Sequence, residues 1–191
     1  MAITPVDPQS AAGLAYAKIS SYGTAGITRA NAPTFIASIL SAVRVDPRED
    51  WCAAFASWAF REALTGGKSG KTFPYNAGTQ TILGWFESHM ASRITRNPQD
   101  VLAMPGAIYI AHDSDGSGHG HMGIIMNRDV ANGTLTQMIT CEGNTSKPGD
   151  RNILGAFIKT REISDMGLPY GWDEVYYINT QDIAGGSWFG P

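Results

Sequence analysis

The sequence predicts an α+β fold in which N-terminal helices pack on a central antiparallel β-sheet. Helix-period patterns fill the first half of the chain, and short β-like runs separated by glycine, proline and Asn-Gly follow Pro98. Helices first and strands second is the order typical of α+β folds. The chain has 191 residues, of which 43% are hydrophobic, so we expect one domain with one core.

Four segments carry the pattern of helices: 9–20, 33–43, 51–64 and 79–91. In the second, Pro33 suits a first helical position and Asn31 is a candidate cap. The third is the clearest, because it is rich in alanine and carries an apolar stripe. We expect Asp50 to cap this helix and Gly66 to end it.

Five runs have the pattern of strands: 107–111, 121–126, 134–142, 154–160 and 174–178. Asn132-Gly133 between the second and third runs favours a two-residue hairpin turn. With such a turn His121 lies opposite Asn144 and shares one face with Glu142. Cys141 falls on the other face. A bulge or a longer loop would change this register.

The two cysteines differ in their predicted surroundings. Cys52 stands at the start of the clearest helix, where unpaired N–H groups and the helix dipole favour a thiolate. His121 with its polar neighbours supplies a base and an orienting group, so these residues can form a nucleophile–base–orienter set. The alternative for Cys52 is a small core residue. His119 is the rival base, but it lies in a glycine-rich loop.

Composition excludes several classes of protein. The formal net charge is −3, so the chain has no basic field for nucleic acid. Two cysteines cannot form a disulfide scaffold or a four-thiolate zinc site. No apolar run approaches membrane-spanning length, and residues 1–30 lack the pattern of a Sec signal. We therefore expect synthesis in the cytoplasm without membrane insertion.

The segment 112–121 raises the question of a metal. Asp113 and Asp115 followed by Gly116 are similar to part of a calcium loop, but the later bidentate glutamate is missing. The histidines and aspartates of this segment could also form a transition-metal cluster. His121 is better explained as a base, so we expect a flexible loop at the mouth of the site, with no metal and no cofactor.

Three motifs resemble those of CHAP-type amidohydrolase/peptidase domains, within the papain-like NlpC group. WCAAFASWAF is similar to the cysteine motif, GHGHMGIIM to the histidine motif and CEGN to the end of the next strand. MPGAIYIA resembles the strand before the histidine, with Ala107 in place of the usual acid. The motifs occur in family order over roughly residues 45–145, and they imply a papain-like fold.

The resemblance implies hydrolysis of amide bonds in bacterial peptidoglycan. Cys52 matches the nucleophile, His121 the general base, Glu142 the third residue and Asn144 the polar residue beside it. The implied substrates are peptidoglycan stem peptides. We expect the substrate groove to be lined by Trp51, Tyr75, Trp85 and His119.

The expected organisation is a single catalytic domain. It has an N-terminal extension (1–30), a CHAP-like core (31–160) and a C-terminal strand and tail (161–191). The expected setting is a monomeric wall hydrolase, either a type VI effector with an immunity protein or a phage lysin. It would act in the periplasm or wall of a target cell. The alternatives are an acyl- or amide-transferring enzyme on the same fold and a non-enzymatic metal- or wall-binding phage module.

Overall fold

The protein has an α+β fold in a computed structural model, which describes residues 10–46, 48–65, 73–101, 105–113, 119–131, 134–165 and 172–180. Its helices are α1 (Ala11–Ser20), α2 (Pro33–Ala42), α3 (Cys52–Thr65) and α4 (Thr79–Met90). Its strands are β1 (Ile27–Thr28), β2 (Ile94–Thr95), β3 (Ile108–His112), β4 (Gly120–Ala131), β5 (Thr134–Lys147), β6 (Asp150–Glu162) and β7 (Glu174–Ile178). Short 3-10 turns are η1 (Gly23–Ala25), η2 (Ala91–Arg93), η3 (Pro98–Val101) and η4 (Ile163–Asp165).

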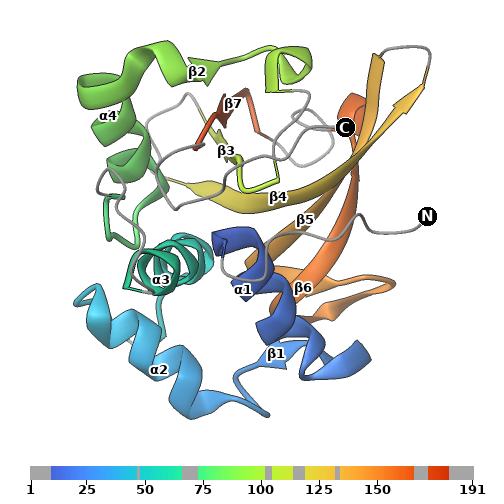
Figure 1. Cartoon of the computed structure of the whole chain (residues 1–191). Coiled ribbons are helices and arrows are strands. Elements are labelled where there is room, and N and C mark those ends of the chain that lie inside the picture. Colours follow the sequence, from blue (N-terminus) through green and yellow to red (C-terminus); the bar gives the residue numbers. More distant parts are fainter. Residues whose placement is uncertain are drawn as a thin grey trace.

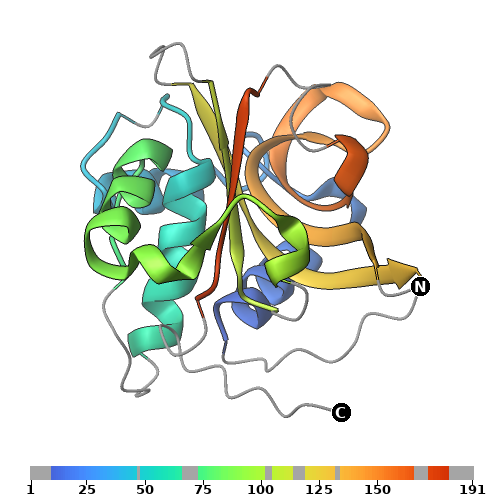
Figure 2. The same ribbon diagram turned by 90° about the horizontal axis from the view of Figure 1, so that it is seen from above.

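The strands form one antiparallel sheet in the order β1-β6-β5-β4-β3-β7-β2. The long strands β4, β5 and β6 curl strongly, as Figures 1 and 2 show. All five predicted strands are present. The two outermost strands, β1 and β2, were not predicted, because a two-residue strand has no period to detect. None of the helices in the described ranges is long and apolar enough to cross a membrane.

The main core lies between the helices and one face of the sheet. Figure 2 shows α3 and α4 stacked on one side of the central strands. Ala15 and Ile19 of α1, Ile39 of α2 and Phe55 of α3 are buried in this core. Helix α1 packs in this same core. Strand β1 belongs to the sheet, because its Ile27 pairs with Ala156 of β6, and Ile27 is also buried in the core.

Two predicted helix caps are wrong. Ala32, not Asn31, precedes α2, and the Asn31 side chain instead binds the backbone of Thr28 and Gly26. Trp51, not Asp50, holds the cap position of α3, because its carbonyl accepts the bond from the Phe55 N–H. Pro33 does begin α2, as predicted. Gly66 lies outside the described residues.

The predicted register of the β4–β5 hairpin holds next to the site, although the hairpin contains two bulges. An extra residue in β5, Thr136, shifts the pairing by one. An extra residue in β4, Met126, shifts it back, so that Ile124 pairs with Cys141. Because the two bulges cancel, side chains near the site return to the faces that the simple hairpin predicts.

Candidate active site

Cys52 begins α3, where the backbone N–H groups of the first turn have no partner within the helix. The residue is 4% exposed, and its Sγ lies 4.0 Å from the carbonyl oxygen of Gly120, the first residue of β4. Gly143 of β5 allows the helix this close, since a Cβ there would lie 2.6 Å from Phe55 Cβ. The helix start is therefore pressed against the sheet where β4 begins.

His121 is held by a carboxylate on the neighbouring strand. Its Nε2 lies 2.9 Å from Oε2 of Glu142, and its side chain is 13% exposed. The Cys52 side chain is also close enough to the imidazole to raise its pKa. The structure thus brings together the three residues that the sequence placed in a nucleophile–base–orienter set.

The Cys52–His121 contact forms around the end of β4. Met122 and Ile124 point into the helix-facing core, so strand alternation turns His121 toward the opposite face of the sheet. Cys52 lies against Gly120 at the strand end, and from there it reaches the imidazole. Cys52 and His121 therefore approach each other from the two sides of the sheet.

Glu142 is fully buried and has partners for both of its oxygens. Arg161 of β6 donates from Nε to Oε1 at 2.8 Å and from Nη2 to Oε2. Thr140 donates its hydroxyl to Oε1 at 2.6 Å. Sequence reasoning missed Arg161 and Thr140. Strand alternation could have found both residues. Thr140 is two residues before Glu142 on the same strand, and Arg161 falls on the same face of the sheet once the predicted strand 154–160 is extended by one residue.

The charges of the site are coupled. Burial alone would lower the pKa of His121, but the contacts with Cys52 and Glu142 outweigh it and raise that pKa to about 9. Burial alone would raise the pKa of Glu142, but His121 and Arg161 hold it well below its usual range. At neutral pH a protonated imidazole therefore lies between the Cys52 side chain and a buried carboxylate.

Asn144, expected as the polar residue beside Glu142, makes its side-chain hydrogen bond elsewhere. Glu142 holds His121 through Nε2. Asn144 lies in a β-bulge of β5 with a left-handed backbone, at φ 50°. This bulge ends the simple alternation, and Asn144 Nδ2 instead donates to Oδ1 of Asp50 at 2.5 Å. Asn144 thus ties β5 to the segment before α3.

The other predicted site residues are spread around the molecule. Trp51 is buried against Phe55 and forms one wall of a cavity. Tyr75 packs under Arg61, and Trp85 stacks on His89 within α4. His119 is exposed, and its carbonyl accepts a bond from the Asp113 N–H. The structure therefore places His121, not His119, beside the cysteine.

The predictions for Cys141 and for the acidic loop have different outcomes. Cys141 is buried on the helix-facing side, as predicted, and burial raises its pKa. It is therefore a core thiol.

Asp115 and Gly116 of the calcium-like loop lie outside the described residues. Within the described ranges, no three His, Cys, Asp or Glu side chains are grouped to hold a metal ion.

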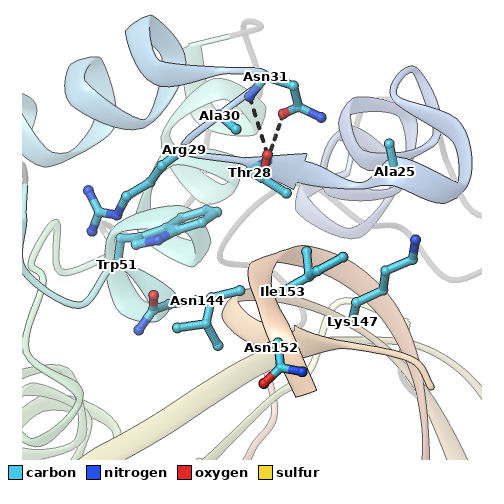
Figure 3. Close-up of a pocket in the computed structure, with 11 residues that line it drawn as sticks. Ala25, Thr28, Arg29, Ala30, Asn31, Trp51, Asn144, Lys147, Asn152 and Ile153 are labelled. Atoms are coloured by element: carbon cyan, nitrogen blue, oxygen red, sulfur yellow. Dashed lines mark hydrogen bonds between the residues drawn. The ribbon is translucent and has the colours of Figure 1, made fainter. Parts of the chain in front are cut away.

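A cavity of about 690 Å³ adjoins the site (Figure 3). Trp51, which precedes Cys52, and Asn144, two residues after Glu142, both line it. Its remaining walls are the segment from η1 to α2 and the β5–β6 hairpin. Two residues close in sequence to the candidate site therefore contribute to the wall of this cavity.

The arrangement can perform nucleophilic acyl chemistry. It has a thiol at a helix start, a base in contact with it and a buried carboxylate that orients the base. Comparisons of the chain with protein-family models, with curated proteins and with solved structures found no match. The chemical interpretation therefore rests on the geometry of the residues themselves.

Proposed function

We propose that the protein is a cysteine hydrolase of amide bonds, with Cys52 as nucleophile, His121 as general base and acid, and Glu142 as the orienting group. The observation that supports this most strongly is the contact chain from Cys52 through His121 to the buried Glu142 carboxylate. The three motifs in family order favour a papain-like fold and peptidoglycan stem peptides as the substrate.

The proposed reaction has two steps. The thiolate attacks the amide carbonyl carbon, and the protonated His121 gives its proton to the leaving amine as the C–N bond breaks. A thioester on Cys52 and a neutral imidazole remain. His121 then takes a proton from water, whose oxygen attacks the thioester carbon and releases a carboxylic acid. The Cys52 N–H at the helix start is placed to stabilise the oxyanion.

Isolated peptidoglycan tests the proposal, with Cys52→Ala and Cys141→Ala compared in parallel. The two variants remove the same atom, one from the site and one from the core. We expect Cys52→Ala to lower the release of new amino termini by roughly 10³-fold or more. Cys141→Ala should retain activity at temperatures where circular dichroism shows it folded.

Two results would contradict this mechanism. Unchanged release by Cys52→Ala would exclude the thiol as nucleophile. Activity that survives Cys52→Ala and disappears with a chelator would indicate a metallohydrolase instead. The chemical identity of the released ends, read by mass spectrometry, also identifies the bond that is cut.

We further propose that the hydrolase acts on the wall of a target cell as a type VI effector, with a phage lysin as the alternative. The net charge of −3 gives no attraction to an anionic wall, which favours an injected protein. An effector requires an immunity protein in the producing cell. An adjacent gene whose product binds this chain and blocks release supports an effector, whereas an adjacent holin gene supports a lysin.

A further inference from the structure

We infer that Tyr109 is a further positioning residue of the candidate site, whose hydroxyl donates to the Glu142 carboxylate once His121 has given up its proton. The inference rests on the proposed function, because it concerns the step in which the imidazole protonates the leaving amine. It gives a role to a buried polar group that the proposed reaction does not otherwise use.

The Tyr109 hydroxyl is buried without a hydrogen-bond partner. The residue is 2% exposed, and its Oη is the fully buried side-chain polar atom that lacks a partner among the described residues. Burying a hydroxyl without a bond costs free energy, which is why such groups are rare in folded proteins. A phenylalanine would fill the same space without that cost, so packing alone does not explain a tyrosine here.

Strand pairing brings this side chain to Glu142. Tyr109 of β3 pairs with Gly123 of β4. A Cβ on Gly123 would lie 3.2 Å from Tyr109 Cζ, which carries the hydroxyl, and 2.7 Å from Glu142 Cγ. The two side chains therefore meet over the glycine. The ring of His121 lies on the same face of β4, with its centroid 6.2 Å from that of Tyr109.

The hydroxyl also interacts electrostatically with the site. Burial raises the pKa of Tyr109 well above its ordinary value of 10.0, and the Glu142 carboxylate raises it further. Cys52 acts in the same direction and Arg161 in the opposite one. At neutral pH the hydroxyl therefore keeps its proton, and toward the carboxylate it can act only as a donor.

In the resting state the Glu142 carboxylate already has a full set of donors. An ionised carboxylate has about four lone-pair positions. Arg161 donates to both oxygens, Thr140 donates to Oε1, and His121 donates to Oε2. The Tyr109 hydroxyl is thus an additional donor beside a carboxylate that is already saturated, which explains why it has no well-formed bond.

This balance changes when His121 protonates the leaving amine. The imidazole becomes neutral, so its bond to Glu142 is no longer charge-assisted and weakens. The Tyr109 hydroxyl can then rotate about its C–O bond toward the carboxylate and offset part of the lost interaction. No proton leaves Tyr109. The hydroxyl makes the neutral imidazole less costly, which assists proton transfer from a group whose pKa is raised to about 9.

Tyr109→Phe tests the inference, because it removes the hydroxyl and keeps the ring. Without this donor the neutral imidazole is less favourable, so we expect the pKa of His121 to rise by about half a pH unit. NMR titration of the full chain measures it on the resonance that His121→Gln lacks. With soluble peptidoglycan fragments, kcat should fall about two- to threefold, KM should stay unchanged, and the alkaline limit of kcat/KM should move to higher pH.

Tyr177→Phe is the matched control. Tyr177 of β7 pairs with Tyr109, lies in the same buried cluster and is also 2% exposed. Burial is the cause of its raised pKa of about 12, whereas Glu142 contributes to that of Tyr109. Tyr177→Phe should therefore leave the titration of His121 and kcat unchanged.

Urea denaturation separates a change in activity from a loss of the fold. Tyr109→Phe should unfold at the same urea concentration as the wild type or at a higher one, because it removes a buried hydroxyl that has no partner. A marked fall in its midpoint would assign the hydroxyl to the fold and overturn the inference.

The remaining outcomes separate the role of Tyr109 from the proposed function. An unmoved or lowered pKa of His121 in Tyr109→Phe, or an equal rise in Tyr177→Phe, would overturn the inference. Unchanged kcat in Tyr109→Phe would do the same while the proposed function stands. A raised pKa of His121 in a protein whose wild type cleaves no peptidoglycan would overturn the proposed function, while the coupling of Tyr109 to His121 stands.

Discussion

At the scale of single residues, the charge balance of the site depends on Glu142. Its carboxylate has 0% exposure and would be costly to bury alone. Arg161 supplies the compensating positive charge through two bonds, and Thr140 adds a neutral donor. Glu142 can then remain ionised and hold His121 by one oxygen. Arg161 is therefore a positioning residue that acts on His121 through Glu142.

Arg161→Met tests this role. It removes the cation that pairs with both oxygens of the buried Glu142 carboxylate and leaves His121 bound to one of them, so we expect a loss of about 3–5 kcal/mol in the free energy of unfolding. The double variant Arg161→Met/Glu142→Gln also removes the carboxylate charge and should recover most of that loss. Urea denaturation of both variants measures the effect.

Activity measurements distinguish a role of Arg161 in positioning His121 from a role in stability alone. The double variant should remain at least roughly 10²-fold less active than the wild type, because a neutral amide no longer supports the protonated imidazole. Its alkaline limit of kcat/KM should also move to lower pH. A stable double variant with wild-type kcat and an unmoved pH profile would show that the Arg161–Glu142 pair serves the fold alone.

At the scale of elements, β3, β4 and β5 meet closely at Gly123. A Cβ at this position would lie 2.6 Å from Tyr109 Cε1 and 2.7 Å from Glu142 Cγ. Both neighbours are buried, so neither side chain can swing away into solvent. The absence of a side chain on β4 is what lets Glu142 lie flat over that strand and reach His121.

Gly123→Ala should therefore lower stability and activity together. We expect a loss of about 1–3 kcal/mol from overpacking, and a lower kcat because the Glu142 carboxylate shifts. Gly84→Ala is the control, because a Cβ in this part of α4 meets nothing within 4 Å. In a helix interior it should raise stability by about 0.5–1 kcal/mol. Equal effects of the two substitutions would contradict the close approach at Gly123.

At the scale of the whole molecule, the site is assembled from four elements. Cys52 comes from α3, His121 from β4, Glu142 from β5 and Arg161 from β6. None of these residues is adjacent to another in the sequence, so their contacts exist only while the helix layer stays packed on the sheet. Folding and the ionisation of the site are consequently linked.

The free energy of unfolding should be highest within a range of pH and should decrease at both lower and higher pH. The pKa of His121 is raised to about 9 in the folded state, so its contribution is complete below its ordinary value of 6.5 and is lost as pH rises through 9. The pKa of Glu142 is lowered, so its contribution is complete above its ordinary value of 4.5 and is lost as pH falls. Between these values both contributions are present.

Urea denaturation from pH 3 to pH 10 measures this dependence. We expect His121→Gln to lose the decline above neutrality and to keep an acid limb, because Arg161 still holds Glu142. Subtracting the stability profile of His121→Gln from that of the wild type removes the contribution of the other titrating groups. Profiles that run parallel over the whole range would contradict the coupling of His121 to the fold.

Local patterns were sufficient to predict the helices and most strands. Alanine-rich and helix-period segments became α1 to α4, and the predicted pairing of Ile124 with Cys141 holds because two bulges in the hairpin cancel. These features depend on neighbours close in sequence, where periodicity and turn chemistry act directly. Caps were less predictable, since Trp51 took the position expected of Asp50. A helix cap depends on the backbone path just before the helix, and the residue types of the segment do not specify that path by themselves.

The sequence by itself determined that Cys52 begins a helix, that Cys141 lies on the other face, and that His121 and Glu142 share a strand face. Only the tertiary structure decided that Cys52 reaches His121 around the end of β4, that a bulge directs Asn144 to Asp50, and that Arg161 balances Glu142. The physical reason is that sheet curvature, bulges and the pairing of buried charges depend on segments far apart in the sequence, for which no local period exists.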